Sequence, residues 1–194
     1  MGDNAPTCVF PWPMNLPTWI TVSRLLGVPL ILILLTHPTP YERWIAAGIF
    51  LLAAGTDWLD GYLARKLNQV TELGKFLDPL VDKLLVLAPL LVLVEMNLVP
   101  AWGVFLIVAR EITIAGWRVN PTMQSGGVPG ANLWGKAKTV VQIAAITALL
   151  APLPEAFLLP SQILFWLAVA LTLLSGLVYL LPALRSPSNV QDIP

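Results

Sequence analysis

Six apolar runs divide this sequence and set the limits on its fold. They cover residues 19–36, 43–63, 76–95, 99–118, 136–152 and 161–181. A helix needs about 17–25 residues to cross the hydrocarbon core of a bilayer, and the runs are close to that length. In lipid only helices and closed barrels satisfy every backbone hydrogen bond, and these runs lack the alternation of strands. The sequence therefore predicts an all-α integral membrane protein with six transmembrane helices in one bundle.

Composition supports the membrane assignment and excludes several kinds of site. The chain is 57% hydrophobic and 11% charged, whereas soluble domains carry about 25% charged residues. Basic and acidic residues number 11 each, and no basic tract of the kind that binds nucleic acid is present. Cys8 is the single cysteine and His37 the single histidine, which excludes an intrachain disulfide and cysteine or multi-histidine metal sites. A metal bound here would need oxygen ligands.

The charged residues between the runs predict an orientation. Six spans place both termini on one side, and the basic residues of that side are Arg24, Arg65, Lys66, Lys75, Arg118, Lys136, Lys138 and Arg185. The loops of the other side contain only Arg43. Basic residues favour the cytoplasmic side, so we expect a multi-pass cell-membrane protein with cytoplasmic termini. Its membrane domain should cover 14–182, between a loose extension at 1–13 and a flexible tail at 183–194.

Four aspartates at the cytoplasmic ends of the second and third spans indicate a metal site. Asp57 and Asp60 are three residues apart and share one helix face, and Asp78 and Asp82 are four apart and share another. The short connection makes the two helices antiparallel neighbours, so the four carboxylates should converge. Oxygen-only ligands favour Mg²⁺, Mn²⁺ or Ca²⁺, and four carboxylates suffice for two ions that clamp a phosphoryl group. Solvated helix-end charges paired with nearby lysines explain this matched spacing less well.

Small and basic residues surround the aspartates in the sequence. Gly61 and Ala64 lie beside the first acidic pair and allow a ligand or helix to approach closely. Gly74 lies one turn before the second pair and leaves room at the same place. Arg65 follows the first pair and can reach an anionic ligand with its planar guanidinium. These residues predict that an anionic ligand binds beside the metals.

The pattern D-x2-D-G-x2-A-R-x8-G-x3-D-x3-D, which fills residues 57–82 without departure, resembles the signature of the CDP-alcohol phosphotransferase family. The resemblance extends over roughly residues 14–180. The segment from Asn15 to Thr18, with Thr21 and Arg24, is similar to the amino-terminal segment of that family. The sequences 109–112 and 135–139, together with Arg118, resemble the branch of the family that makes phosphatidylglycerophosphate.

The resemblance implies a fold, a reaction and roles for individual residues. It implies a homodimer of six-helix subunits with a polar cavity open to the cytoplasm, and two divalent cations, Mg²⁺ or Mn²⁺, held by the four aspartates. It implies that Asp82 is also the general base. The substrates would be CDP-diacylglycerol and glycerol 3-phosphate, and the products phosphatidylglycerophosphate and CMP. The residues expected to contact CDP-diacylglycerol are Thr21, Asp57, Gly61, Ala64, Arg65, Thr71 and Gly74.

The acceptor site is expected in the fourth and fifth runs. Glycerol 3-phosphate is a small dianion, and the basic residues of these runs are Arg110, Arg118, Lys136 and Lys138. Arginine suits bidentate phosphate binding and lysine acts as a point charge. A basic residue near a helix end can instead extend to the interface, which for Lys138 explains the sequence equally well.

Two other functions are compatible with these residues. A related enzyme of the same family could use inositol phosphate, or phosphatidylglycerol, as its acceptor. A membrane transporter for metal ions could use the aspartates as an ion path, but it predicts acidic residues at several membrane depths. The last two apolar runs contain no acidic residue, so the enzyme is favoured.

Overall fold

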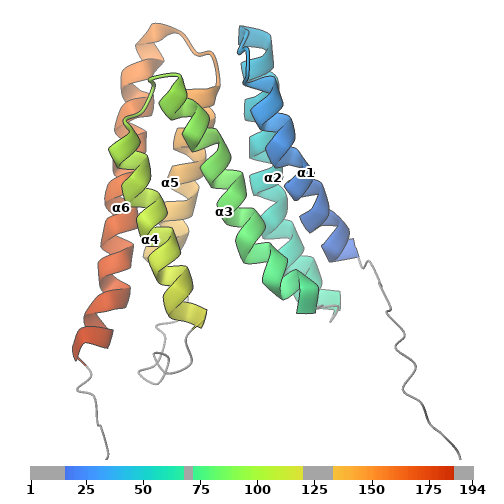
Figure 1. Ribbon diagram of the computed structural model, residues 1–194, viewed down its shortest axis with the longest axis vertical. Helices are drawn as coiled ribbons and strands as arrows, with labels where there is room; N and C mark the ends of the chain where they lie inside the picture. The colour runs from blue at the N-terminus through green and yellow to red at the C-terminus, as the bar shows by residue number, and fades with distance from the viewer. Residues whose placement is uncertain (1–15, 68–71, 120–132, 186–194) are drawn as a thin grey trace, which may run out of the picture.

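The chain forms an up-and-down bundle of helices (Figure 1). The computed structural model describes the backbone of residues 16–67, 72–119 and 133–185, and side chains within 23–56, 79–116 and 135–177 except Lys136. The helices are α1 (Leu16–Leu34), α2 (Pro40–Leu67), α3 (Glu72–Glu95), α4 (Ala101–Val119), α5 (Leu133–Leu150) and α6 (Leu158–Arg185), with a 3-10 turn η2 (Glu155–Phe157). The described residues contain no strand, which confirms the predicted all-α class.

Each helix corresponds to one predicted apolar run, and the ends differ by a few residues. α2 continues to Leu67 and α3 begins at Glu72, so both extend into polar sequence beyond the predicted spans. α6 ends at Arg185, three residues past the predicted end of the domain. Residues 1–13, expected to be a loose extension, lie outside the described residues.

Local signals explain several of these ends. α2 begins at Pro40, and Thr39 precedes it: the Thr39 backbone N–H donates to Glu42 Oε2 at 2.8 Å, and the Glu42 N–H donates to Thr39 Oγ1 at 3.3 Å. This reciprocal pair satisfies two backbone donors at the helix start. α3 is followed by Asn97, which has a positive φ of 56°. Asparagine tolerates this left-handed conformation, which commonly ends a helix.

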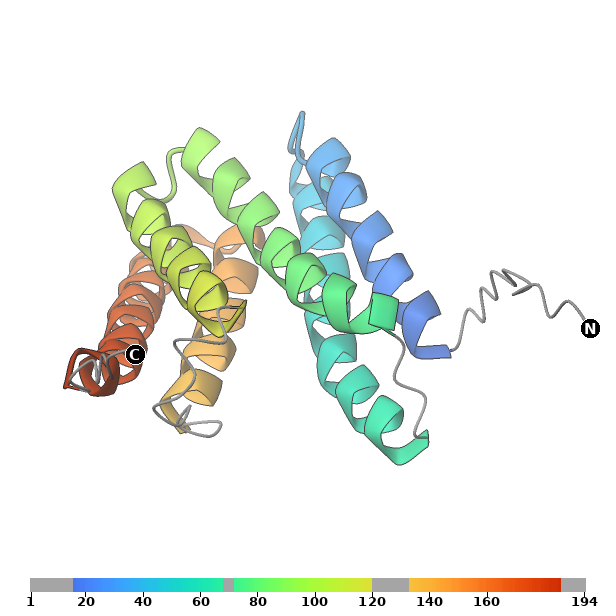
Figure 2. The same ribbon diagram turned by 60° about the horizontal axis from the view of Figure 1, so that its bottom comes forward.

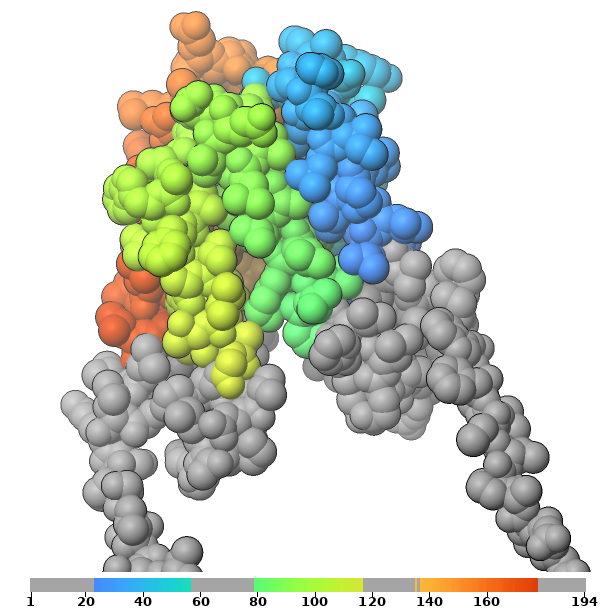
Figure 3. All heavy atoms as spheres, viewed as in Figure 1, coloured from blue at the N-terminus to red at the C-terminus, as the bar shows by residue number. Residues whose placement is uncertain are grey.

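The helices pack in two groups of three (Figure 2). In the first group α1 packs closely against both α2 and α3, whereas α2 and α3 contact each other less. In the second group α6 packs against α5 and α4. Contacts of α2 with α5, and of α3 with α4 and α5, join the two groups. On one face α1, α3 and α4 lie side by side (Figure 3).

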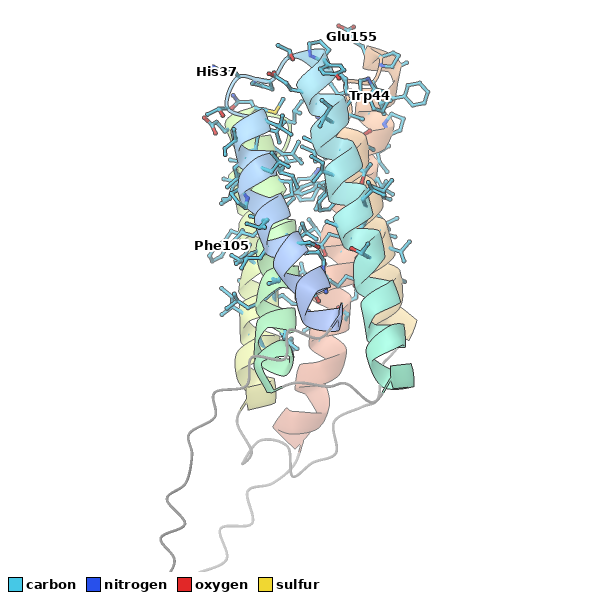
Figure 4. The ribbon with its side chains drawn as sticks, turned by 90° about the vertical axis from the view of Figure 1, so that its right-hand side faces the viewer. His37, Trp44, Phe105 and Glu155 are labelled. Carbon is cyan, nitrogen blue, oxygen red and sulfur yellow. The ribbon has the colours of Figure 1, made fainter. Side chains whose placement is uncertain are left out.

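The two ends of the bundle are distinguished by the helix termini that they contain. We call the end where α1 begins and α6 finishes the inner end, and the opposite end the outer end (Figure 1). His37, Trp44 and Glu155 lie at the outer end (Figure 4). The described core gathers around fully buried side chains such as Phe50, Leu90 and Leu150, which anchor the helices that reach the inner end.

The perimeter of the bundle is apolar. Large hydrophobic side chains are exposed on several helices, among them Ile33, Leu52 and Phe105; Phe105 is labelled in Figure 4. By length and hydropathy, Glu155–Leu177 is the one segment of the described chain that suffices to cross a membrane. Ser23–Leu34 and Ala137–Leu150 are shorter apolar helices.

Candidate functional site

The acidic motif occupies the inner halves of α2 and α3. Asp57 and Asp60 lie in the continuous helix α2, and Asp78 and Asp82 in α3, so each pair shares a helix face as expected. The two helices also contact each other. Among these four, the structure describes the side chain of Asp82, and the other three side chains lie outside the described set.

Asp82 is paired with a buried arginine from another helix. Arg24 of α1 donates from Nη1 to Asp82 Oδ1 at 2.9 Å, and the exposed fractions of the two side chains are 2% and 44%. The cation therefore comes from the packed interior, while the carboxylate remains partly open. The sequence placed Arg24 among the basic residues of the cytoplasmic side and in the segment that resembles the family's amino-terminal segment, but it did not predict this contact. The sequence feature that could have indicated a buried ion pair is the position of this arginine inside the first apolar run.

A second polar cluster lies between α4, α5 and α6. Glu111 of α4 accepts hydrogen bonds at the same Oε1 atom from Arg110 Nη1, at 3.2 Å, and from Lys138 Nζ of α5. Arg110 Nη2 also donates to Ser175 Oγ of α6 at 3.0 Å. The exposed fractions of the Arg110 and Lys138 side chains are only 12% and 9%. Two predicted acceptor residues are thus brought together in a largely buried site, with Glu111 as their shared partner.

The cation cluster and Asp82 lie on helices that contact each other. Lys83 follows Asp82 in α3. The Lys83 ammonium itself donates to the Pro79 carbonyl at 3.0 Å. The helix that contributes Asp82, α3, contacts both α4, which carries Arg110, and α5, which carries Lys138.

For the other predicted site residues, the structure describes either the backbone alone or nothing. For Thr21, Gly61, Ala64, Arg65, Gly74, Arg118 and Lys136, only the helical backbone is described. Thr71 lies wholly outside the described residues. Among the side chains that are described, no three or more His, Cys, Asp or Glu residues form a group able to hold a metal. The motif nevertheless offers carboxylate oxygens, a donor set that suits Mg²⁺ or Mn²⁺.

Comparison with known proteins finds one family and several similar enzymes. A family model described as CDP-alcohol phosphatidyltransferase matches residues 14–174. The chain is 43% identical over 180 residues to a CDP-diacylglycerol–glycerol-3-phosphate 3-phosphatidyltransferase of Bacillus subtilis, covering 85% of this chain and 93% of the relative. It is 40% identical over 177 residues to the enzyme of that name from Pseudomonas fluorescens, covering 86% and 89%. It is 36% identical over 200 residues to a cardiolipin synthase (CMP-forming) of Oryza sativa, covering 92% and 60%.

Proposed function

We propose that this chain, which belongs to the CDP-alcohol phosphatidyltransferase family, transfers the phosphatidyl group of CDP-diacylglycerol to glycerol 3-phosphate. The products are phosphatidylglycerophosphate and CMP. The observation that carries the choice of acceptor is the buried pair of cations, Arg110 and Lys138, on two helices that contact α3 of the acidic motif. The names of the bacterial relatives support the same acceptor.

The acceptor is bound through its phosphate group. Arg110 and Lys138 together carry one more charge than their shared partner Glu111, so the cluster attracts an anion. Burial strengthens that attraction, because water screens the charges less inside the bundle. Arg118 and Lys136, from the inner ends of α4 and α5, complete the phosphate site in this proposal.

The donor is bound at the acidic motif. Asp57, Asp60, Asp78 and Asp82 hold two divalent cations, Mg²⁺ or Mn²⁺, which neutralise the pyrophosphate and the departing CMP when they are bound. Gly61, Ala64 and Gly74 leave room for the nucleotide, and Arg65, Thr71 and Thr21 contact it. Family membership supports this metal dependence.

Asp82 acts as the general base in this proposal. Its carboxylate takes the proton of an acceptor hydroxyl, whose oxygen bonds to the phosphorus that carries the diacylglycerol, and the bond from that phosphorus to CMP breaks. Arg24 holds Oδ1 at 2.9 Å, which fixes the direction of the carboxylate. A general base acts only when held within hydrogen-bond reach of its proton.

The protein works as a homodimer in the cell membrane, with six spans and with its termini and site on the cytoplasmic side. The exposed apolar perimeter supports burial in lipid. The acidic motif, the end of α4 and the start of α5 all lie toward the inner end (Figure 1), where charged substrates arrive from water.

Purified protein in lipid nanodiscs with CDP-diacylglycerol tests the reaction. Labelled glycerol 3-phosphate, inositol phosphate and phosphatidylglycerol are supplied separately, and lipid product and CMP are measured with Mg²⁺, with Mn²⁺ and with EDTA. We expect phosphatidylglycerophosphate from glycerol 3-phosphate, and no product with EDTA. Product formed from inositol phosphate alone would contradict the proposed acceptor. If none of the three acceptors leads to release of CMP, the proposed enzyme class is wrong.

Cardiolipin synthesis is the second candidate, because a plant enzyme with that name is among the relatives. Its acceptor would be phosphatidylglycerol, whose terminal glycerol carries no phosphate monoester. The paired cations Arg110 and Lys138 favour an acceptor with a terminal phosphate. Product from phosphatidylglycerol in the same assay would decide for this candidate.

A further inference from the structure

We infer that Ser175 and Gly176 of α6 are positioning residues that set the direction of the Arg110 guanidinium, and so determine how tightly the phosphate of the acceptor is bound. The inference rests on the proposed function, in which Arg110 contacts that phosphate. Neither residue belongs to the acidic motif or to the basic residues expected to bind the acceptor. From sequence alone they suggest only close helix packing.

Ser175 presents an oriented acceptor to Arg110. Its side chain is buried, with 2% exposed, and its hydroxyl donates to the Thr172 carbonyl at 2.9 Å. A serine hydroxyl has one proton and two lone pairs. Because the proton is used within α6, a lone pair is left to accept from Arg110 Nη2 at 3.0 Å.

Gly176 leaves the space that the Arg110 side chain occupies. A β-carbon at position 176 would lie 3.0 Å from Arg110 Cγ and 3.5 Å from Arg110 Nε. The first distance is shorter than ordinary van der Waals contact, so any other residue would displace the arginine. Gly176 is therefore matched to the path of this one side chain.

The fixed guanidinium keeps donor capacity for a ligand. Nη1 bonds Glu111 and Nη2 bonds Ser175, and the buried Nε has no hydrogen-bond partner among the described residues. An arginine has five N–H donors in a rigid plane. Since a phosphate is bound through such a plane, a small rotation of the guanidinium misaligns its donors.

If Gly176 served only to let α4 and α6 pack closely, any equal crowding of these two helices should have the same effect. A second glycine between α4 and α6 provides the matched control. At Gly103 of α4 a β-carbon would lie 3.0 Å from the Phe165 ring of α6. Gly103→Ala therefore crowds the same pair of helices to the same degree, but about two helical turns from Arg110 and against an apolar ring. Gly116→Ala on α4 meets nothing within 4 Å and serves as the uncrowded control.

Steady-state kinetics separate the two roles. We expect Gly176→Ala and Ser175→Ala to raise KM for glycerol 3-phosphate about tenfold, as for loss of one hydrogen bond to a charged group. KM for CDP-diacylglycerol should stay unchanged in both. Gly103→Ala and Gly116→Ala should leave both KM values at the wild-type level. Equal changes in Gly176→Ala and Gly103→Ala, or an unchanged KM for glycerol 3-phosphate, would overturn the inference.

Anion binding without turnover gives a second measurement. Inorganic phosphate or glycerol 3-phosphate should raise the melting temperature of the wild type and of Gly103→Ala, and should do so much less in Ser175→Ala and Gly176→Ala. If Gly176→Ala does not fold, Ser175→Ala decides, because it removes only a hydroxyl. A wild type that binds neither anion overturns the inference. A wild type that binds them but forms no phosphatidylglycerophosphate contradicts the proposed reaction instead.

Discussion

Arg24 and Asp82 show how a single contact connects the packed interior to the acidic motif. Arg24 is buried and Asp82 is partly exposed, so the arginine is held by its surroundings while the carboxylate stays partly open to a ligand. A charge as deeply buried as that of Arg24 needs a charged partner. The contact therefore stabilises α1 against α3 and, in the proposed mechanism, aims the general base.

Asp82→Asn should abolish phosphatidyl transfer and should lower the melting temperature without unfolding the protein, because the buried Arg24 loses its charged partner. The amide keeps the size of the side chain and can still accept from Arg24, but it cannot take a proton. General-base catalysis contributes about 10²–10⁴-fold, so we expect kcat to fall at least about a hundredfold. CMP release measures the rate, and the melting temperature reports the fold.

Glu95→Gln provides the matched control for this change. Glu95 ends the same helix at the outer end and is exposed, so the substitution removes one carboxylate of α3 far from the motif. Its kcat should equal that of the wild type. An Asp82→Asn variant with near-normal kcat would show that another group accepts the proton.

Residue spacing predicted part of the candidate site. The shared helix faces of the aspartates in 57–82 follow from their spacing. The contacts of Arg24 with Asp82 and of Arg110 with Ser175 join residues that are 58 and 65 positions apart. Such contacts depend on how helices pack, and one sequence contains no information on the rotation of each helix about its axis.

At the level of helices, Arg43 connects α2 to the end of α5. Its Nε donates to the Leu150 carbonyl and its Nη2 to the Leu149 carbonyl, both at 3.0 Å. The last carbonyls of a helix have no partner within it and carry the negative end of the dipole. This contact explains why the side that is otherwise poor in basic residues contains an arginine.

Arg43→Met should destabilise the bundle and leave the catalytic constants unchanged. The substitution keeps most of the apolar stem and removes two hydrogen bonds from a charged donor, which stabilise by about 2 kcal/mol in total for a partly exposed group. The midpoint of denaturant unfolding in detergent measures the change. Arg43→Lys keeps the charge but loses the planar guanidinium, so its unfolding midpoint should lie between those of the wild type and Arg43→Met. A wild-type midpoint in Arg43→Met would show that the contact does not stabilise the fold.

The start of α2 should make stability depend on pH. Hydrogen bonds from the Thr39 side chain and backbone lower the pKa of Glu42 below its ordinary value. A carboxyl group whose pKa is lower in the folded state stabilises the fold above its unfolded pKa. That contribution is lost as the pH falls through the folded pKa.

Comparison of the wild type with Glu42→Gln tests this dependence. At neutral pH the wild type should be the more stable of the two, and the difference in unfolding midpoint should shrink as the solution is acidified below the ordinary glutamate pKa. In a Thr39→Ala background, glutamate and glutamine at position 42 should give nearly the same unfolding midpoint, because Glu42 then loses its main hydrogen-bond donor. A difference that stays constant down to low pH would contradict the assignment.

Hydropathy located the helices well and their ends less well. An apolar run marks the part of a helix that suits lipid, whereas the helix itself continues through good helix formers such as Arg65 and Lys66 at the end of α2. α1 ends earlier than predicted, at Leu34, three residues before the His37–Pro38 pair. The residue before a proline is disfavoured in helical conformation.

Across the whole molecule, the two groups of helices carry different charges, which the proposed mechanism combines in one site. α1, α2 and α3 carry the acidic motif with Arg24, and α4, α5 and α6 carry the cluster of Arg110, Glu111, Lys138 and Ser175. The donor and acceptor of a transfer reaction can then be bound by separate groups of helices. The apolar core around Phe50 and Leu90 holds the two groups together.

The proposed orientation can be tested with single cysteines, because the chain has only Cys8 to remove. In a Cys8→Ser background, cysteines replace His37 and Glu155 at the outer end (Figure 4) and Leu67, the last residue of α2. We expect a membrane-impermeant maleimide to label positions 37 and 155 on intact cells and position 67 only after permeabilisation. Six spans with cytoplasmic termini require this pattern, because an odd number of spans separates position 67 from each of the other two. Labelling of position 67 on intact cells would reverse the orientation and would place the acidic motif on the side without nucleotide substrates.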